Sequence, residues 1–462
     1  MSGEMDKPYL GQKVLVVGAA RSGVASAEFL LSRGAHVVLT DAKSEEALTI
    51  PLAPLRKLAQ NSGELVLELG GHKPGSFTHC DFAVISPGVP LAHPLFEETR
   101  KAGIPVLAEV ELASRHLKGT ILGITGSNGK TTTTTLVAEL LRGAGLRGFV
   151  AGNIGNPLIG LVSASTPADI YVVELSSFQL ESIQAFRPFV GAILNLTPDH
   201  LDRYRDFAGY IGAKQRIFMN QTVSDFAVLN DDDTRTAAMA AQVSSTPVLF
   251  SRRHEVARGA FVRSGRLVYR DGHHDTDLFP AQEIRLKGGH NLENVLAACA
   301  IALLAGAAPG GLAGVVRAFA GVEHRLEFVG EFDGVQYFND SKATNVDATI
   351  KSLEAFPRNI VLIAGGRDKG GDFLPLRPLV AERVKHLIVI GEAAGKIRAA
   401  LSDAVETSEA ESLPDAVQFA CRRASPGDIV LLAPACASFD MFKNYEHRGR
   451  VFKEAVLRLV RK

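Results

Sequence analysis

Residues 119–131 read GTILGITGSNGKT and combine a strand pattern with a glycine-rich loop. The first seven residues are mostly apolar or β-branched, which predicts a buried strand, and residues 126–131 then lead into a helix. Such a loop offers backbone N–H groups that surround phosphates, a lysine, and a hydroxyl suited to Mg²⁺. The spacing is not that of the standard phosphate loop, because Ile124 stands at the position of the first glycine. A nucleotide-binding α/β domain is predicted, with a fortuitous turn as the alternative.

Strands and helices alternate along the whole chain, which predicts parallel sheets in three α/β domains in series. We expect an N-terminal Rossmann-like domain (residues 1–113), a central phosphate-loop ATPase-type domain (114–321) and a C-terminal Rossmann-like domain (322–462). Residues 245–285 contain short alternating stretches that predict a small antiparallel insertion in the central domain. The apolar runs that predict strands are residues 13–17, 36–40, 64–69, 82–85, 119–125, 170–173, 190–194, 227–229, 359–364, 386–390 and 428–432.

Composition narrows the class of protein. The chain has 462 residues, enough for about three domains at roughly 150 residues each. Its 50 basic residues balance 50 acidic ones. A protein that neutralises many phosphates of a nucleic acid is normally basic, so we expect no nucleic-acid partner. The four cysteines form no CxxC pair, which indicates a reducing compartment rather than a disulfide or zinc framework.

No segment has the pattern of a secretion signal or a membrane span. The first residues lead directly into a strand pattern. The longest uncharged run, residues 295–316, is rich in alanine and interrupted by a Pro-Gly-Gly sequence, so it predicts a buried helix and its loop. We therefore expect a cytoplasmic protein without membrane insertion, and we expect it to be a monomer.

A second glycine-rich turn lies near the N-terminus. Residues 18–23 read GAARSG at a strand-to-helix turn, and Asp41 ends the next strand. This resembles the dinucleotide-binding fingerprint, except that Ala20 occupies the second glycine position, where the backbone must approach a diphosphate. Three interpretations stay open for this turn: tight packing of strand and helix, a nucleotide other than NAD, and NAD itself, as in a nicotinamide-dependent Rossmann dehydrogenase.

Carboxylates follow the strands of the predicted central domain. Glu174 ends one apolar strand, and Asp199, His200 and Asp202 follow another. Each alone is more typical of a loop cap, but Mg²⁺ prefers oxygen ligands, and the ends of successive parallel strands meet at one edge of a sheet. A metal site beside the phosphate loop is therefore predicted. Lys214, in a helical stretch, is by residue type alone a solvated surface lysine.

The motifs, taken together, resemble the Mur ligases of peptidoglycan synthesis from end to end. The resemblance rests on GITGSNGKTTT, AGNIGNP, VELSSFQLE, LNLTPDHLDRY, GAKQRIF, GGHNLENVLAA, GVEHRLE and FNDSKATN, in that order. Within the family, NDSKATN, GGRDKGGDF and PACASFDMFKNYEHRG resemble the branch that adds D-glutamate. The DNPR-type motif of the diaminopimelate-adding branch is absent from the sequence.

The resemblance implies an ATP-dependent amide ligase with UDP-N-acetylmuramoyl-L-alanine and D-glutamate as substrates. ATP phosphorylates the terminal carboxylate of the first substrate, and the amine of D-glutamate displaces phosphate from the resulting acyl phosphate. One alternative is a related ligase, including the folylpolyglutamate type, that adds another amino acid such as L-glutamate. Another is a nucleotide-binding switch without catalysis.

The resemblance also implies roles for individual residues around ATP. Lys130 contacts the β- and γ-phosphates, and Thr131 and Glu174 hold one Mg²⁺. Glu174, His200 and Lys214 hold a second Mg²⁺, with Lys214 carbamylated by CO₂ so that it becomes an oxygen ligand. The other implied ATP contacts are Gly126, Ser127, Asn128, Gly129, Thr132, Asn291, Asn294, Arg325 and Asp340.

The two substrates are assigned to opposite ends of the chain in the same way. Tyr445 stands where the family often has phenylalanine. The C-terminal domain is expected to close over the central one and complete the site. The implied D-glutamate contacts are Lys342, Thr344, Lys369, Ser438 and Tyr445. The implied UDP-sugar contacts are Arg21, Ser22, Asp41, Lys43, Ser86 and Gly88, with Asn153 and His200 of the central domain.

Overall fold

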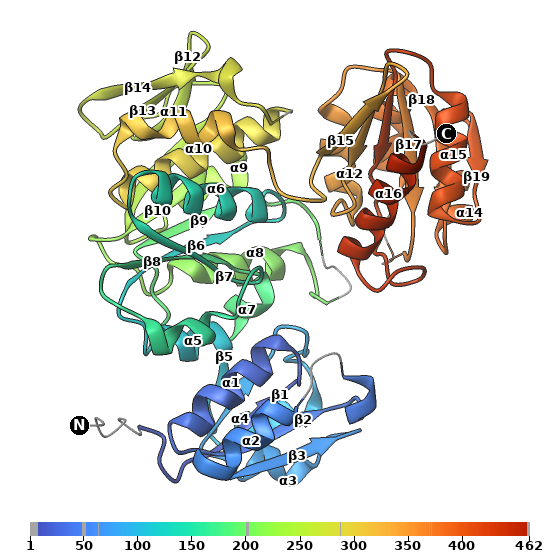
Figure 1. Cartoon of the computed structure of the whole chain (residues 1–462). Coiled ribbons are helices and arrows are strands. Elements are labelled where there is room, and N and C mark those ends of the chain that lie inside the picture. The colour runs from blue at the N-terminus through green and yellow to red at the C-terminus, as the bar shows by residue number, and fades with distance from the viewer. Residues whose placement is uncertain are drawn as a thin grey trace.

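The computed structural model describes residues 8–48, 52–62, 64–199, 203–286, 288–368, 370 and 372–459. These residues form three sheets that follow one another along the chain, so the predicted α/β fold with three domains in series is confirmed. In Figure 1 the N-terminal domain (blue) lies below the central domain, and the C-terminal domain (orange and red) lies beside it. No helix among these described residues is long and apolar enough to cross a membrane.

The N-terminal domain has a wholly parallel sheet with the strand order β3-β2-β1-β4-β5. Continuous buried apolar runs, such as residues 14–17, suit a sheet that helices cover on both faces. Its strands are β1 (Lys13–Val17), β2 (His36–Asp41), β3 (Leu65–Leu69), β4 (Phe82–Ile85) and β5 (Val106–Ala108). Its helices are α1 (Arg21–Ser32), η1 (Glu45–Ala47), α2 (Ala53–Ser62), α3 (Pro74–Thr78), α4 (Pro94–Lys101) and α5 (Glu109–Ser114).

The turn between β1 and α1 requires glycine at two positions. Gly18 has a φ of 96°, which side chains other than glycine rarely adopt. A Cβ on Gly23 would lie 1.8 Å from the carbonyl oxygen of Gly18. Helix α1 can therefore approach the end of β1 this closely only because both residues lack a side chain. Tight packing, one of the three interpretations of residues 18–23, is thus a real function of these glycines.

The central domain has the strand order β14-β13-β12-β11-β10-β9-β6-β8-β7. Residues 245–285 were predicted to form a separate antiparallel insertion, and this prediction is wrong in part. β11 and β12 continue the parallel sheet, and β13 pairs antiparallel with both β12 and the edge strand β14. The strands are β6 (Thr120–Thr125), β7 (Arg147–Gly152), β8 (Asp169–Glu174), β9 (Val190–Ile193), β10 (Phe226–Asn230), β11 (Thr246–Ser251), β12 (Gly259–Arg263), β13 (Arg266–Arg270) and β14 (Asp275–Pro280).

Helices α6 and α10 lie against each other and bury the apolar interior of this domain. Ten residues of α10 are buried, which is why its sequence is rich in small and apolar residues. The helices of the domain are α6 (Lys130–Gly143), η2 (Leu158–Ala164), α7 (Ser177–Glu181), α8 (Phe207–Gln215), η3 (Arg216–Phe218), α9 (Thr234–Met239), η4 (Ala281–Glu283), α10 (Gly289–Leu304) and α11 (Pro309–Ala318).

The C-terminal domain has the strand order β15-β16-β20-β17-β18-β19, parallel except for β15. The predicted boundaries at residues 113/114 and 321/322 fall between the three sheets and stay predictions. The strands are β15 (Glu327–Phe332), β16 (Val335–Asn339), β17 (Ile360–Gly365), β18 (Val384–Ile390), β19 (Thr407–Glu409) and β20 (Ile429–Leu432). The helices are α12 (Val346–Glu354), η5 (Leu374–Leu376), α13 (Arg377–Arg383), α14 (Ala394–Leu401), α15 (Leu413–Arg423) and α16 (Tyr445–Leu459).

Two buried glutamates of α5 join the N-terminal domain to the central one. The Glu111 carboxylate accepts hydrogen bonds from three consecutive backbone N–H groups, at residues 184–186. The Glu109 carboxylate accepts one from the N–H of Ile159, at 2.6 Å. Burial raises the pKa of Glu109 to about 7. Both carboxylates accept hydrogen bonds directly from the backbone of the central domain. Helix α5 therefore fixes the position of the N-terminal domain against the central one.

The strand order of the central sheet determines which loops meet at the predicted nucleotide site. β6 lies between β8 and β9, and the loops after these three strands emerge at the same edge of the sheet. The chain after β6 crosses to one side and the chain after β8 to the other, which makes this edge a topological switch point. Ligands of open α/β sheets bind at such points. The phosphate loop, Glu174 and the segment that contains Asp199 are therefore neighbours.

We expect Gly23→Ala to destabilise the N-terminal domain by about 2 kcal/mol or more, because its Cβ overlaps a backbone carbonyl that cannot move aside easily. Urea unfolding followed by tryptic digestion measures this effect. Gly75→Ala is the matched control, since a Cβ there meets no atom within 4 Å. Equal unfolding midpoints for the two variants would contradict the role assigned to Gly23.

Candidate active site

The phosphate loop, residues 126–131, is held in place by the chain that follows β9. Asn195 accepts a hydrogen bond from the N–H of Asn128 at 2.8 Å and donates one to its carbonyl at 3.0 Å. The hydroxyl of Ser127 donates to the carbonyl of Thr197 at 2.8 Å. A Cβ on Gly129 would lie 2.2 Å from the side-chain oxygen of Asn294, so α10 packs directly on the loop. The loop is thus preorganised by two neighbouring elements.

Two lysines bind the carbonyl groups of this loop. Lys130 donates to the carbonyls of Gly126 and Ser127, both at 2.8 Å. Lys214, on α8, donates to the carbonyl of Gly126 at 2.9 Å and is only 1% exposed. Burial and the neighbouring Lys130 hold the pKa of Lys214 well below its usual range. The interpretation of Lys214 as a surface lysine is therefore wrong, because its face of α8 packs against the loop.

Glu174 and Thr131 meet as the metal prediction requires. The Glu174 carboxylate ends β8, is 1% exposed, and accepts hydrogen bonds from Thr131 at 2.8 Å and Asn153 at 2.7 Å. A buried carboxylate beside a hydroxyl is the hard oxygen donor set that Mg²⁺ prefers. These residues fit a magnesium ion at this place. His200, the other predicted ligand, lies outside the described residues.

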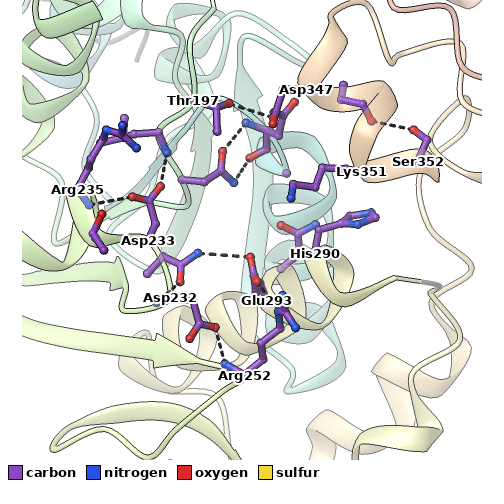
Figure 2. A pocket seen from close by; sticks show the side chains of 18 of the residues that line it. Thr197, Asp232, Asp233, Arg235, Arg252, His290, Glu293, Asp347, Lys351 and Ser352 are labelled. Carbon is purple, nitrogen blue, oxygen red and sulfur yellow. Dashed lines mark hydrogen bonds and ion pairs between the residues drawn. The ribbon is translucent and has the colours of Figure 1, made fainter. Parts of the chain in front are cut away.

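A cavity of about 310 Å³ lies between the central and C-terminal domains beside the phosphate loop. Its size suits a small-molecule ligand. Figure 2 shows that helix α12 forms one wall and that residues following β10 and β11 form another. Five predicted ATP residues line it: Asn128, Gly129, Asn294, Arg325 and Asp340.

Six predicted ATP residues do not line this cavity: Gly126, Ser127, Lys130 and Thr131, which belong to the phosphate loop beside it, and also Thr132 and Asn291. Asn291 instead accepts a hydrogen bond from Asn294 at 3.1 Å, so it orients a residue that does. Thr132 is buried within the first turn of α6. The sequence matched their motifs, but only the helix geometry shows that these side chains turn away from the cavity.

Asp340 carries a buried oxygen atom aimed at no hydrogen-bond donor among the described residues. Its other oxygen accepts from Ser352 at 2.6 Å. Burial raises the pKa of Asp340, and the positive charge of Arg325 opposes that change. An acceptor of this kind on the cavity wall fits a ligand that carries hydroxyl groups.

Several charged residues that line the cavity were not predicted from the sequence, and five of them follow β10 or β11. Arg252 pairs with Glu293 at 2.6 Å, and its backbone N–H donates to Asp232 at 2.8 Å. The signal was available, since Asp and Arg runs directly after two parallel strands meet at the sheet edge where ligands bind. The missed lining residues include Asp232, Asp233, Arg235, Arg252, Arg253, His290, Glu293, Asp347 and Lys351.

The predicted amino-acid pocket meets the phosphate loop through Lys342. Its amino group donates a hydrogen bond to the hydroxyl of Thr131 and lies 5.5 Å from the ring centre of Tyr445. Burial lowers the pKa of Lys342 to about 8. The N–H of Thr344 donates to the Lys342 carbonyl at 2.8 Å, and Ser438 is buried in the loop after β20. Lys369 lies outside the described residues.

Arg448, which the sequence analysis did not single out, holds this pocket together. Its side chain is fully buried and donates to the carbonyls of Ser341 at 2.8 Å, Cys436 at 3.1 Å and Ala437 at 3.2 Å. These residues adjoin Lys342 and Ser438 in the chain. A buried guanidinium with several acceptors fixes the loops that bear them, because leaving it unpaired costs a great deal.

The predicted UDP-sugar residues surround the turn between β1 and α1. Asp41 accepts hydrogen bonds from the N–H groups of Ala19 at 2.7 Å and Lys43 at 2.9 Å, and Ser86 donates to the carbonyl of Gly18 at 3.0 Å. Asp41 and Ser86 therefore brace the turn itself. The other predicted residues of this group lie half-buried or exposed around it: Arg21, Ser22, Lys43 and Gly88.

Comparison with known proteins agrees with this arrangement. Residues 12–108 match the N-terminal domain model of MurD-like Mur ligases, residues 124–302 the Mur ligase middle domain, and residues 324–436 the glutamate ligase domain of Mur ligases. A protein of Koribacter versatilis named UDP-N-acetylmuramoylalanine--D-glutamate ligase is 48% identical over 97% of this chain and 98% of its own length. The chain belongs to the Mur ligase family.

Other similar proteins give the same result for this Mur ligase. A Geotalea daltonii protein with the same name is 51% identical over 96% of this chain and 97% of its own length. The crystal structure of UDP-N-acetylmuramate-alanine ligase MurC from Thermotoga maritima has 20% identity and a TM-score of 0.59, covering 97% of this chain and 100% of its own. At that identity the likeness concerns the fold. Family membership removes the basis for a nicotinamide-dependent dehydrogenase, which rested on residues 18–23 and Asp41.

Arg203 connects the central domain of this Mur ligase to its predicted sugar loop. The guanidinium donates to the carbonyls of Pro87 at 3.3 Å and Val89 at 3.1 Å, on either side of Gly88. It also lies 3.7 Å from the ring centre of Phe178, so its position is fixed from the central side. Sequence reasoning missed Arg203, although it belongs to the LNLTPDHLDRY motif.

We expect Arg203→Ala to raise about tenfold the KM for the UDP-sugar substrate that the sequence motifs imply, since it removes two charge-assisted hydrogen bonds that hold the loop. The Kd for ATP, measured by calorimetry, is expected to stay within about twofold, because these contacts lie on the other domain boundary. Arg205→Ala, an exposed arginine of the same segment, is the control. A rise in KM that is equal in both variants would contradict the role of Arg203.

Proposed function

We propose that this Mur ligase uses ATP to join D-glutamate to UDP-N-acetylmuramoyl-L-alanine, as a cytoplasmic step of peptidoglycan precursor synthesis. The observation that carries the proposal is the contact between Lys342 and Thr131 beside Glu174. It brings the domain that matches the glutamate ligase model directly against the phosphate loop. The names of the similar proteins identify the substrates that suit this arrangement.

The proposed reaction proceeds in two displacements. A carboxylate oxygen of UDP-N-acetylmuramoyl-L-alanine attacks the γ-phosphorus of ATP, and ADP leaves. The ammonium group of D-glutamate loses one proton to solvent, the resulting amine attacks the acyl carbon, and inorganic phosphate leaves with a second proton from the nitrogen as the amide forms. The first step is needed because a carboxylate oxygen is a poor leaving group until it is phosphorylated. Such transfers depend on positioning and charge neutralisation.

The residues of the phosphate loop would supply that positioning. Its N–H groups and Lys130 would bind the β- and γ-phosphates, for which Lys130 exchanges the carbonyls of Gly126 and Ser127 for phosphate oxygens. Asn294, Arg325 and Asp340 would hold the nucleoside end in the cavity, where Asp340 offers its unpaired oxygen to a hydroxyl. Mg²⁺ at Thr131 and Glu174 would neutralise charge on the transferred phosphate.

We assign the substrates to the two outer domains. The turn between β1 and α1, with the predicted UDP-sugar residues around it, would bind the UDP moiety, and Asn153 would contact the sugar peptide. Lys342, Thr344, Lys369, Ser438 and Tyr445 would bind D-glutamate, because cations and hydroxyls match its two carboxylates. We retain residues 1–113, 114–321 and 322–462 as the three domains, and a monomer as the working unit.

Lys214 is proposed to carry a carbamate and to hold the second Mg²⁺ with Glu174 and His200. Its burial and the nearby Lys130 favour the neutral amine, which is the form that reacts with CO₂. As an ammonium, Lys214 would repel a metal ion. As a carbamate, it would bring the negative oxygen that a second cation requires beside Glu174.

The proposed function predicts that phosphate release requires all three substrates. With ATP, Mg²⁺ and UDP-N-acetylmuramoyl-L-alanine present, we expect D-glutamate to raise the steady-state rate by at least about 100-fold, because the acyl phosphate has no other acceptor than water. Colorimetric phosphate measurement tests this, with L-glutamate and other amino acids as comparison. An equal rate with L-glutamate would favour the related-ligase alternative. Phosphate release without any amino-acid dependence would contradict the assignment.

Lys214→Ala is expected to lose about 100-fold or more in kcat, because an oxygen ligand of the metal is removed. Formate or acetate at high concentration is expected to restore part of the activity by supplying a carboxylate in the space left free. Lys130→Ala is the matched control: it loses activity as well, but a carboxylate cannot replace its positive charge. Restoration of both variants, or of neither, would contradict the carbamate.

A further inference from the structure

The first turn of helix α12 brings the C-terminal domain onto the loops of the central site. Asn345 is the residue before α12, and Asp347 lies in its first turn. Both contact side chains of the central domain. Neither was predicted as a contact of ATP, Mg²⁺ or a substrate, although Asp347 lines the cavity. Figure 2 shows Asp347 directed toward Thr197 at the edge of the cavity.

Asn345 has two separate hydrogen-bonding functions. Its side-chain oxygen accepts from the N–H of Ala348 at 2.7 Å and thereby caps α12. Its side-chain nitrogen donates to the carboxylate of Asp199 at 3.2 Å. Asp199 stands next to the predicted metal ligand His200 in the chain. One asparagine therefore ties the start of the helix to the segment that follows β9.

Asp347 binds the phosphate loop itself. One oxygen of its carboxylate accepts hydrogen bonds from the side-chain nitrogen of Asn128 and from the hydroxyl of Thr197, the latter at 3.0 Å. Asn128 is in turn held through its backbone by Asn195. The carboxylate therefore binds two side chains whose own backbone is held by hydrogen bonds, at Asn128 to Asn195 and at Thr197 to Ser127.

Lys342 lies close to these contacts in the chain. Lys342 precedes Asn345 by only three residues, and the N–H of Thr344 donates to its carbonyl at 2.8 Å. Behind this segment, Ala348 and Leu353 of α12 are buried in the apolar interior of the C-terminal domain. The helix therefore moves with its domain, and fixing its first turn against the central loops fixes Lys342 against Thr131.

We propose that Asn345 and Asp347 form a latch that docks the C-terminal domain on the phosphate loop and positions Lys342 for the reaction. They are positioning residues, because they act through Lys342 and the loop rather than on a substrate. The inference rests on the proposed function in so far as Lys342 contacts D-glutamate. The docking itself is independent of that assignment.

Steady-state kinetics of Asp347→Ala and Thr197→Val test the latch. Thr197→Val is nearly isosteric and removes only the hydroxyl that binds Asp347. We expect kcat/KM for D-glutamate to fall roughly 10- to 100-fold for Asp347→Ala and about 3- to 10-fold for Thr197→Val, as for lost hydrogen bonds to a charged group. The Kd for UDP-N-acetylmuramoyl-L-alanine is expected to change less than about twofold, because its domain takes no part in the latch.

Glu354→Ala is the matched control. It removes a carboxylate from the same helix, where Glu354 is exposed and pairs with Lys351 at 3.1 Å. Its kcat/KM is expected to stay within about twofold of wild type. In a double-mutant cycle, Asp347→Ala and Thr197→Val are expected to be non-additive, whereas Asp347→Ala and Glu354→Ala add.

Small-angle X-ray scattering of the ligand-free full chain separates the latch from the proposed function. We expect a larger radius of gyration for Asp347→Ala than for wild type and Glu354→Ala, whichever amino acid the enzyme uses. An unchanged radius together with wild-type kcat/KM, or additive effects of Asp347→Ala and Thr197→Val, would overturn the latch. A wild-type chain that does not respond to D-glutamate would overturn the proposed function and leave the scattering test of the latch intact.

Discussion

The burial of three lysines near the carboxylate of Glu174, with that of Asp199 also close to Lys130 and Lys214, is the constraint on which the rest of the site depends. Burial lowers the pKa of Lys130, Lys214 and Lys342, and the charge of Glu174 opposes that change for each of them. A low-dielectric site with excess positive charge is unfavourable by itself, since buried charges are stable only when paired. Phosphate groups would supply the missing negative charge. The same imbalance would favour the carbamate proposed for Lys214, because that group is an anion.

The central domain also connects the other two. Arg203, in the segment that follows β9, binds backbone carbonyls on either side of Gly88 in the N-terminal domain. Asn345 and Asp347, before and within α12, bind the segment after β9 and the phosphate loop. Both connections start from loops that follow β6 and β9, which are adjacent strands. Movement of either outer domain therefore acts on the same few loops. Under the proposed function, this makes the sheet edge, rather than any single residue, the place where three substrates would be aligned.

Much of this arrangement was visible in local sequence patterns. The strand and glycine-rich loop at residues 119–131, the carboxylate of Glu174 at a strand end, and the close turn at Gly18 and Gly23 follow from short-range chemistry. Asn291 shows the limit of motif matching, because its motif was recognised but its side chain orients Asn294 instead of lining the cavity. The two asparagines are three residues apart on α10. Which of them lines the cavity, and which residues pack against each, depends on the folded domain.

Contacts between distant segments were beyond the reach of those patterns. Lys214 is indistinguishable from a surface lysine until α8 is folded against the phosphate loop, and Asp347 is an ordinary helix-start residue until the C-terminal domain docks on Asn128. Local propensity and the order of apolar residues were sufficient for the three α/β units and the phosphate loop, whereas the family followed from the resemblance of the motifs to those of Mur ligases. Strand order, the burial of charge and the meeting of domains arose only in the folded chain, because they join residues more than 80 positions apart.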